Sequence, residues 1–283
     1  MDRSKQQNIT RGLYLVSTPI GNMEDITLRS LNILKKSDII LCEDTRRSRK
    51  LLDKFNIESK LLPYHKFNEK KISDQIVEII KKNKIVSLIS DAGTPAISDP
   101  GAILVNRCIR ENVDVFPIPG PSAVTASISV SGFCDKYLFY GFLSKKENEL
   151  EKILKNLSDF EYSIVFFIPA LKVNFYIQKF KKYFIDRSIL IAKEISKIHE
   201  EFIREKVDTI KNLPVNLKGE LTIVISEKNS EKNIRRELDE SVKMEIKKML
   251  KRYTIKDVVE FVSKKEKLSK KLIYNFCLKL KKR

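Results

Sequence analysis

The sequence predicts an α/β fold made of two α/β domains, followed by a small basic helical appendage at the C-terminus. Three observations support this. Short apolar runs alternate with amphipathic segments over most of the 283 residues, as expected for strands joined by helices. Clusters of glycine and proline follow several of these runs and break regular structure there. From Glu227 onward the sequence becomes lysine-rich and helical in its spacing.

The first domain is expected over residues 11–120, after a disordered tail at residues 1–10. Its helices show apolar residues three or four positions apart, and they comprise a helix capped by Thr27, one over Thr45–Phe55 and one over Ile72–Lys82. Its strands are short runs of aliphatic residues: Leu13–Val16, Ile39–Cys42, Ile85–Ile89 and Val113–Ile118. Strands that alternate with helices form mostly parallel sheets, and such sheets bind ligands at the carboxyl ends of their strands. We therefore expect a ligand crevice at that edge.

The second domain is expected over residues 121–226, and a basic helical appendage over residues 227–283. Helices are predicted at Glu147–Leu157 and Val173–Lys182. The predicted strands of the second domain are Tyr137–Tyr140, Ser163–Ile168, Ser188–Ala192 and Leu221–Ser226. In the appendage, apolar residues four apart, such as Val242 and Ile246, predict helices behind a polar linker at residues 227–231.

Positive charge is the first indication of function. The chain carries 55 Lys and Arg against 37 Asp and Glu, a net charge of +18. A basic chain attracts polyanions such as RNA, DNA or anionic lipid, although a lysine-rich composition alone would give the same total. The placement is more informative, because the last segment, from Glu227 to Arg283, holds 19 basic and 9 acidic residues. We expect this segment to contact nucleic acid.

Several classes of protein are disfavoured. The four cysteines (Cys42, Cys108, Cys134 and Cys277) form no C-x-x-C pair, so neither a disulfide framework nor a zinc site is indicated. The dinucleotide motif G-x-G-x-x-G, the phosphate-binding loop motif and H-E-x-x-H do not occur, and there are only two histidines. We expect no metal. The polar N-terminus and the lack of a long apolar stretch predict a soluble cytoplasmic protein.

Residues Ser90–Gly101 form the most informative motif. They contain two Asp, two Gly and two Pro, with no Lys, directly after a predicted buried strand. Asp91 would face the crevice, and Gly93 would allow a ligand to approach the backbone. Asp99 and Pro100 are typical of the N-cap and first position of the next helix. An ordinary strand–loop–helix connection would account for any one of these features but less well for their combination.

Residues Pro117–Ala123 form a second motif, with three prolines around Gly120. This pattern predicts a rigid turn, after which Pro121 opens a helix of small residues. Small side chains would let a flat ligand lie against the backbone. The same turn would also serve as a stiff joint between domains, and the two interpretations are compatible.

Residues Glu43–Arg47 form a third cluster after a predicted strand, with two acids, a hydroxyl and two arginines. This composition suits the polar rim of an active site. Taken alone, it is more typical of a helix N-terminus, where acidic residues are favoured. His65, in the segment Pro63–Glu69, is either a catalytic or substrate-contacting group or a loop side chain.

Together these motifs resemble those of the tetrapyrrole-methylase superfamily, and more narrowly its ribosomal RNA branch, the small-subunit methyltransferases I (16S rRNA cytidine 2′-O-methyltransferases). The resemblance covers residues 11–226, and the C-terminal helices also look like those of the family. It rests on LYLVSTPIGN (13–22), EDTR (43–46), SDAGTPAISDPG (90–101) and PIPGPSA (117–123), in this order. Further agreement comes from YHKFNE (64–69), GFL (141–143), KEISK (193–197) and KGE (218–220).

The resemblance implies a two-domain methyltransferase, generally a homodimer, with S-adenosylmethionine in a cleft between the α/β domains. Its substrate would be the ribose of a cytidine in the decoding region of 16S rRNA, within the small ribosomal subunit. Candidate groups for catalysis are Glu43, Asp44 and Asp91 as bases, and Arg46 and Lys193 as partners of negative charge. The expected cofactor-binding residues are Pro19, Ile20, Gly21, Asp91, Gly93, Thr94, Pro95, Pro119, Gly120, Pro121 and Ser122.

Two segments depart from the family pattern. Where the family has a Glu-Ser-x-His-Arg loop, this chain has Ile168–Lys172, and an Arg-Gly-Thr-like turn is replaced by Arg204–Lys206. These changes motivate one alternative, an RNA-binding or ribosome-assembly protein of the same fold with weakened catalysis. A second alternative is a methylase acting on a tetrapyrrole or a protein side chain, but that function gives no purpose to the lysine-rich helices.

Overall fold

The computed structural model describes residues 9–217, 219–228, 238, 240–266, 268 and 270–281. The chain divides into two compact units, one before Lys228 and one from Lys228 onward. The predicted tail falls mainly on residues 1–8, and the predicted linker falls partly on residues 229–231, so both lie largely outside this description. Ile9 packs against the core of the first sheet, and the carbonyl oxygen of Thr10 accepts a hydrogen bond from the Tyr14 hydroxyl.

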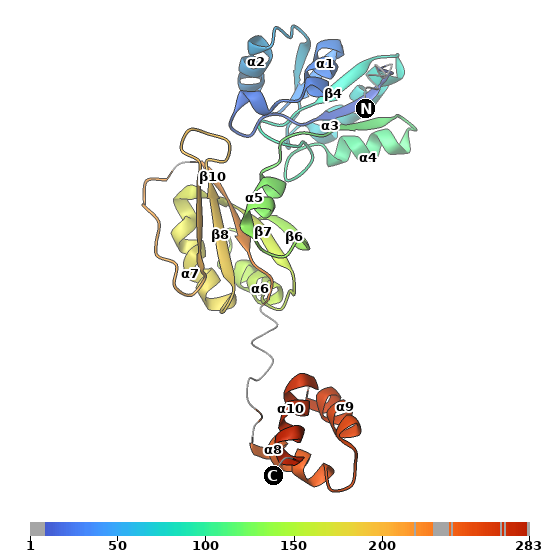
Figure 1. Ribbon diagram of the computed structural model, residues 1–283. Helices are drawn as coiled ribbons and strands as arrows, with labels where there is room; N and C mark the ends of the chain where they lie inside the picture. The colour runs from blue at the N-terminus through green and yellow to red at the C-terminus, as the bar shows by residue number, and fades with distance from the viewer. Residues whose placement is uncertain are drawn as a thin grey trace. The chain divides into compact units, whose positions relative to one another are not determined.

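The first sheet is entirely parallel, with strand order β3-β2-β4-β1-β5. Figure 1 shows β4 of this sheet together with the helices α1, α2, α3 and α4. Helices α1 and α2 pack on one face, where Leu34 and Leu52 are buried, and α3 and α4 pack on the other around Ile80 and Leu104. Covering both faces lets the strands consist of almost continuous aliphatic residues. The strands are β1 (Gly12–Val16), β2 (Ile39–Cys42), β3 (Lys60–Pro63), β4 (Ile85–Leu88) and β5 (Val115–Ile118); the helices are α1 (Leu28–Lys36), α2 (Thr45–Lys54), α3 (Glu69–Lys81) and α4 (Ala102–Arg110), with a 3₁₀ turn η1 at Met23–Asp25.

Between the neighbouring strands β1 and β4 the strand order of the sheet reverses, because the chain leaves β1 toward β2 on one side and leaves β4 toward β5 on the other. The connection after β1 crosses one face through α1, and the connection after β4 crosses the other face through α4. A crevice opens at the carboxyl ends of such strands, because their loops turn to opposite sides. The predicted cap of α1 is confirmed, since the hydroxyl of Thr27 accepts the backbone N–H of Ser30 at 3.0 Å.

The second sheet has strand order β6-β7-β10-β8-β9. Only its β6–β7 neighbours are parallel, and its three other neighbouring pairs are antiparallel. Helices α6 and α7 bury one face around Phe166 and Phe180, whereas α5 lies on the other face with Val124 against Val165. The elements are α5 (Ala123–Ser131), β6 (Tyr137–Phe142), α6 (Glu147–Ser158), β7 (Ser163–Pro169), the 3₁₀ turn η2 (Ala170–Lys172), α7 (Val173–Tyr183), β8 (Ser188–Lys193), β9 (Glu201–Lys206) and β10 (Glu220–Ile225).

Two predictions about helix starts are wrong. Helix α4 is not capped by Asp99, because the chain turns at Gly101 (φ 142°) and the helix begins at Ala102. A Cβ on Gly101 would lie 2.8 Å from a Leu88 methyl carbon, so this turn requires glycine. Helix α5 does not open at Pro121 but at Ala123, after Ser122 in extended conformation. Both differences leave the preceding residues in loops, where Asp99 and Ser122 line cavities.

The C-terminal unit is a cluster of three helices, α8 (Glu240–Met249), α9 (Ile255–Glu266) and α10 (Lys270–Lys281). Its core contains Val242, Ile246, Val258, Val262 and Ile273, each almost completely buried. Aliphatic burial of this kind stabilises a helix cluster by about 2 kcal/mol per side chain. Among the described residues, no helix combines the length and the apolar composition needed to cross a membrane.

Candidate active site

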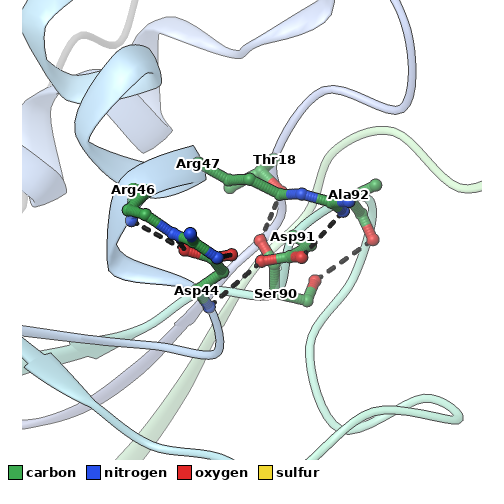
Figure 2. Close-up of polar contacts among 7 residues, drawn as sticks. All are labelled: Thr18, Asp44, Arg46, Arg47, Ser90, Asp91 and Ala92. Atoms are coloured by element: carbon green, nitrogen blue, oxygen red, sulfur yellow. Dashed lines mark hydrogen bonds and ion pairs between the residues drawn. The ribbon is translucent and has the colours of Figure 1, made fainter.

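The loops that follow β1 and β4 are hydrogen-bonded to each other at the carboxyl edge of the first sheet. The backbones of Thr18 and Gly93 exchange two hydrogen bonds, at 2.9 and 3.0 Å. The hydroxyl of Thr18 also donates to the carbonyl oxygen of Ser90 at 3.2 Å, as Figure 2 shows. Ser17 and Thr94 join their hydroxyls at 3.0 Å. The convergence predicted from the glycine and proline clusters is therefore present in the structure.

Asp91 joins the β4 loop to the start of α2 (Figure 2). Its carboxylate accepts the Arg47 guanidinium at 2.9 Å and the backbone N–H of Asp44 at 3.3 Å. Arg47 remains 71% exposed, so its remaining donors face solvent. This arrangement holds Asp91 in one orientation and places a cation at the same rim.

Asp44 and Arg46 bind each other instead. Asp44 caps α2 through the Arg46 backbone N–H at 2.8 Å and pairs with the Arg46 guanidinium at 3.0 Å. Hydrogen bonds from Arg46 lower the pKa of Asp44 to about 2. Arg46 is 87% exposed, and neither residue lines a cavity described below.

The two sheets of the first unit meet at two glycines. A Cβ on Gly21 would lie 2.5 Å from the carbonyl oxygen of Ile195, so the turn after β1 approaches the turn after β8 as only glycine allows. Ser196 in that second turn accepts the backbone N–H of Asn22 at 3.2 Å. Gly141 (φ 81°), at an irregularity in β6, lies against Ser98 in the same way. These contacts place the second sheet across the ligand edge of the first.

A cavity of about 940 Å³ lies between the two sheets. Its walls combine loop backbone, carboxylates, two cations and a group of aromatic rings. The lining residues are Ile20, Glu43, Arg47, Asp91, Ala92, Gly93, Thr94, Ile97, Ser98, Asp99, Ser122, Ala123, Val124, Thr125, Tyr137, Phe139, Phe142, Phe167, Ala192, Glu194, Ile195, Lys197, Gly219, Glu220 and Thr222.

The carboxyl groups of this cavity repel one another. Burial raises the pKa of Asp99 to about 6, with further contributions from Glu43, Asp91 and Glu220. Burial and the charge of Asp91 also raise the pKa of Glu43, although His65 and Arg47 oppose the change. Clustered acids with raised pKa values are typical of functional sites, and this cluster would attract a cationic ligand.

Strained backbone surrounds the same cavity. Ala96 and Ser98 have φ angles of 64° and 63°, and Glu194 and Ser196 have φ angles of 52° and 67°. Left-handed conformations are unfavourable for these residue types and persist only where surrounding contacts impose them. Both strained turns lie where the two sheets meet, since Ser98 contacts Gly141 and Ser196 contacts Gly21.

The predicted cofactor residues divide between this cavity and a second one of about 570 Å³. Ile20, Asp91 and Gly93 line only the larger cavity, and Thr94 and Ser122 line both. The residues that line only the second are Pro95, Pro119 and Gly120, and those that line neither are Pro19, Gly21 and Pro121.

Of the candidate catalytic residues, Glu43 and Asp91 line the larger cavity. Lys193 does not line it. Its ammonium group pairs with Glu201 on the neighbouring strand at 3.0 Å. Arg47, from the cluster predicted to form a polar rim, lines the cavity as well. Residues not expected at the site include Asp99, Lys197, Glu220 and the aromatic rings of β6 and β7. The position of Asp99 in the motif Ser90–Gly101 offered a signal, whereas the aromatic residues look like ordinary strand residues in the sequence.

The altered loop Ile168–Lys172 lies outside the lining of the cavity. Ile168 and Ala170 are buried, and the backbone N–H of Ala170 donates to the carbonyl oxygen of Gly219 at 2.9 Å. The departure from the family pattern therefore changes a segment that pairs with Glu220 in the sheet, through Pro169. Within the described part of the chain, no group of three His, Cys, Asp or Glu side chains is arranged to hold a metal ion.

Comparison with known proteins identifies relatives over most of the chain. The sequence model of the tetrapyrrole (corrin/porphyrin) methylases matches residues 12–211. A protein of Rickettsia prowazekii named ribosomal RNA small subunit methyltransferase I is 40% identical over 95% of this chain and 97% of its own length. The protein of the same name from Thermotoga maritima is 42% identical over 76% of this chain and 98% of its own.

Solved structures agree in fold. A uroporphyrin-III-C-methyltransferase from Thermus thermophilus superposes with a TM-score of 0.55 at 15% identity, covering 76% of this chain and 93% of its own. The cobalt precorrin-4 methyltransferase gives a TM-score of 0.55 at 18% identity, covering 76% and 94%. The predicted α/β fold of the tetrapyrrole methylases is thereby confirmed.

Proposed function

This chain belongs to the tetrapyrrole methylase family, and we propose that it transfers a methyl group from S-adenosylmethionine to the ribose 2′-oxygen of a cytidine in the decoding region of 16S rRNA. The observation that carries the proposal is the alignment with proteins named ribosomal RNA small subunit methyltransferase I, which extends over 95% of the chain in one case. We further propose that it acts in the cytoplasm as a homodimer on the small ribosomal subunit.

The larger cavity suits S-adenosylmethionine by size and by chemistry. Its volume of about 940 Å³ lies at the upper end of those that hold ligands of this class. Asp91 and Asp99 would face the positive charges of the cofactor, and the rings of Phe139 and Phe167 offer an apolar surface for its adenine. The backbone of Thr94, in the same lining, would face its polar groups. When bound, the cofactor supplies an electrophilic methyl group on a positively charged sulfur.

On the acceptor side, the residues of the chain have to orient a ribose and deal with its hydroxyl proton. Glu43 and Asp91 are the candidate bases, and each has its carboxylate at the cavity. The raised pKa of Glu43 makes its carboxylate a stronger base than an ordinary glutamate toward a hydrogen-bonded hydroxyl. Arg47 and Lys197 would hold phosphate at the rim. Fixing the hydroxyl in line with the methyl group would provide much of the rate.

The C-terminal unit would add affinity for RNA through its lysines. Residues such as Lys247, Lys248 and Lys251 are exposed on and after α8. Contacts of this type release counterions from RNA and make the affinity sensitive to salt. An RNA-binding protein with weakened catalysis is the alternative, motivated by the altered Ile168–Lys172 loop, whose residues do not line the larger cavity in this chain.

Calorimetric titration with S-adenosylmethionine separates the two functions. The wild-type protein should bind the cofactor, and Ala92→Trp should abolish binding, because the exposed Ala92 side chain lines the larger cavity and a Trp would fill it without disturbing the core. Ala102→Trp is the matched control, since Ala102 is exposed and lines the second cavity. Absence of binding by the wild-type protein would contradict the proposal, and loss of binding only in Ala102→Trp would move the site to the second cavity.

A further inference from the structure

The segment Tyr64–Lys71, at the carboxyl end of β3, has no part in the function proposed above. It lies beside the Glu43 loop, because β2 and β3 are parallel neighbours and the Tyr64 backbone N–H donates to the carbonyl oxygen of Cys42 at 2.8 Å. His65 acts electrostatically on the Glu43 carboxyl. This segment therefore lies next to Glu43, the candidate base, although none of its own residues lines the cavity.

The segment is a rigid turn. The Asn68 side chain accepts the His65 backbone N–H at 2.9 Å and donates to the carbonyl oxygen of Pro63 at 3.0 Å. The buried hydroxyl of Tyr64 is 3.2 Å from that of Ser73 on α3. These bonds hold both ends of the turn in place.

One further contact ties the turn to an active-site loop, and another closes the turn itself. The Glu69 carboxylate accepts the backbone N–H of Gly101, at the end of the loop that carries Asp91 and Asp99, at 3.4 Å. The carbonyl oxygen of His65 accepts the backbone N–H of Glu69 at 3.0 Å. The turn is thus held in register with the cavity rather than free beside it.

The tip of this turn displays Phe67, whose side chain is 95% exposed. Its ring makes one edge contact with His65, with ring centroids 6.0 Å apart. A rigid backbone that presents a phenylalanine to solvent gains nothing in stability from the ring. The arrangement instead preorganises a flat apolar surface at low entropic cost to a ligand that stacks on it.

Exposed cations are carried by the segment of the ring and by the start of α2. Lys66 and Lys70 are exposed on the same turn, and Arg46 and Arg47 are 87% and 71% exposed at the start of α2. An exposed aromatic ring among cations is the combination with which proteins bind single-stranded nucleic acid, through base stacking and phosphate contacts. An acidic peptide or lipid headgroup would use the cations but not the ring.

We propose that Phe67 is a stacking platform for an unpaired nucleobase beside the target cytidine, with Lys66 and Lys70 at the flanking phosphates. The inference rests on the proposed function and assigns Phe67 a positioning role, since the ring orients the RNA strand and does not touch the reacting atoms. It requires a base that is unstacked from its own strand, as expected where an enzyme must reach a ribose hydroxyl inside structured RNA.

A short single-stranded RNA with the target sequence and 2-aminopurine beside the cytidine tests the platform directly. Stacking on Phe67 should quench its fluorescence upon binding to the wild-type protein. Phe67→Ala should lose the quenching and bind roughly 5- to 150-fold more weakly, the range expected for one lost base–aromatic stack. Phe67→Tyr should restore both properties, whereas Phe67→Leu, apolar but not aromatic, should not.

Phe175→Ala is the matched control, because Phe175 is a half-exposed phenylalanine on α7, which covers the face of the second sheet opposite to α5. It should quench like the wild type. In methyl transfer to small subunits, Phe67→Ala should raise KM with little change in kcat, and S-adenosylmethionine affinity should stay the same. Equal quenching by wild type and Phe67→Ala, or none by wild type, would overturn the inference. Absence of methyl transfer by the wild type would instead contradict the proposed function, while the quenching difference still tests the platform.

Discussion

Replacement of Asp99 by asparagine should stabilise the protein, and only above about pH 4. Asp99 lies between Glu43, Asp91 and Glu220, and burial together with these charges raises its pKa from 3.8 to about 6. In the unfolded chain the carboxyl loses its proton near pH 4, whereas in the folded protein it keeps the proton to about pH 6. Between these values the folded state binds more protons, so the stability of the wild type falls as the pH rises.

The size of the effect follows from the shift. Each pKa unit corresponds to about 1.4 kcal/mol, so a shift of about two units costs the wild type up to about 3 kcal/mol at neutral pH. Water in the cavity screens part of this cost, and we expect about 1–3 kcal/mol. Asparagine keeps the shape of the side chain without its charge, so the variant avoids the whole pH-dependent cost.

Thermal unfolding followed by circular dichroism at pH 4 and pH 7.5 measures this difference. The midpoint of Asp99→Asn relative to wild type should rise by about 2–10 °C between the two pH values. Asp208→Asn, at an exposed turn position, serves as the control and should show the same offset at both. If the Asp99→Asn offset is also independent of pH, the carboxyl cluster does not hold a proton and the electrostatic description of the cavity is wrong.

Three other predictions follow from the contacts. Glu43→Gln should slow single-turnover methyl transfer by about 10²- to 10⁴-fold with unchanged cofactor affinity. Asp44→Asn should keep the rate, because the wild-type Asp44 carboxylate pairs with Arg46. Equal rates for both variants would show that Glu43 is not the base. Arg187 is 2% exposed and donates to the carbonyl oxygens of Ser226, Ser158 and Phe160. Arg187→Lys should therefore lower the free energy of unfolding, measured by thermal unfolding, by about 2–4 kcal/mol. A loss below about 0.5 kcal/mol would contradict this. A chain ending at Glu227 should bind ribosomal RNA more weakly and with a smaller salt dependence in filter-binding assays; an unchanged salt slope would show that the C-terminal unit makes no phosphate contacts.

Much of the fold could be predicted from local patterns. The buried strands of the first sheet are aliphatic runs bounded by turn residues, and Thr27 is recognisable in the sequence as the N-cap of α1. Strands β3 and β9 were missed for a physical reason. β3 contains two exposed positions and a proline, and β9 is a charged edge strand whose pairing with β8 determines its conformation. Edge strands need no apolar alternation, so their sequences resemble loops.

The candidate site was predictable only on one of its two walls. The loops at the carboxyl edge of the first sheet can be predicted from their glycine, proline and acidic residues, and Asp91 and Gly93 do line the cavity. Phe139, Phe167 and Ala192 come from three strands of the second sheet, where an apolar residue facing a ligand looks like one facing the core. Their convergence depends on how the two sheets meet at Gly21 and Gly141, which local sequence does not reveal.

The central claim is methyl transfer to ribosomal RNA, and one measurement tests it most directly. Small ribosomal subunits that lack the modification would be incubated with the protein and labelled S-adenosylmethionine, after which the RNA would be digested and the labelled nucleoside identified and mapped. We predict one labelled nucleoside, 2′-O-methylcytidine, from a single position in the decoding region of 16S rRNA. Label on a base would contradict the 2′-oxygen as acceptor, and no label in RNA, with the cofactor bound, would contradict the proposed activity.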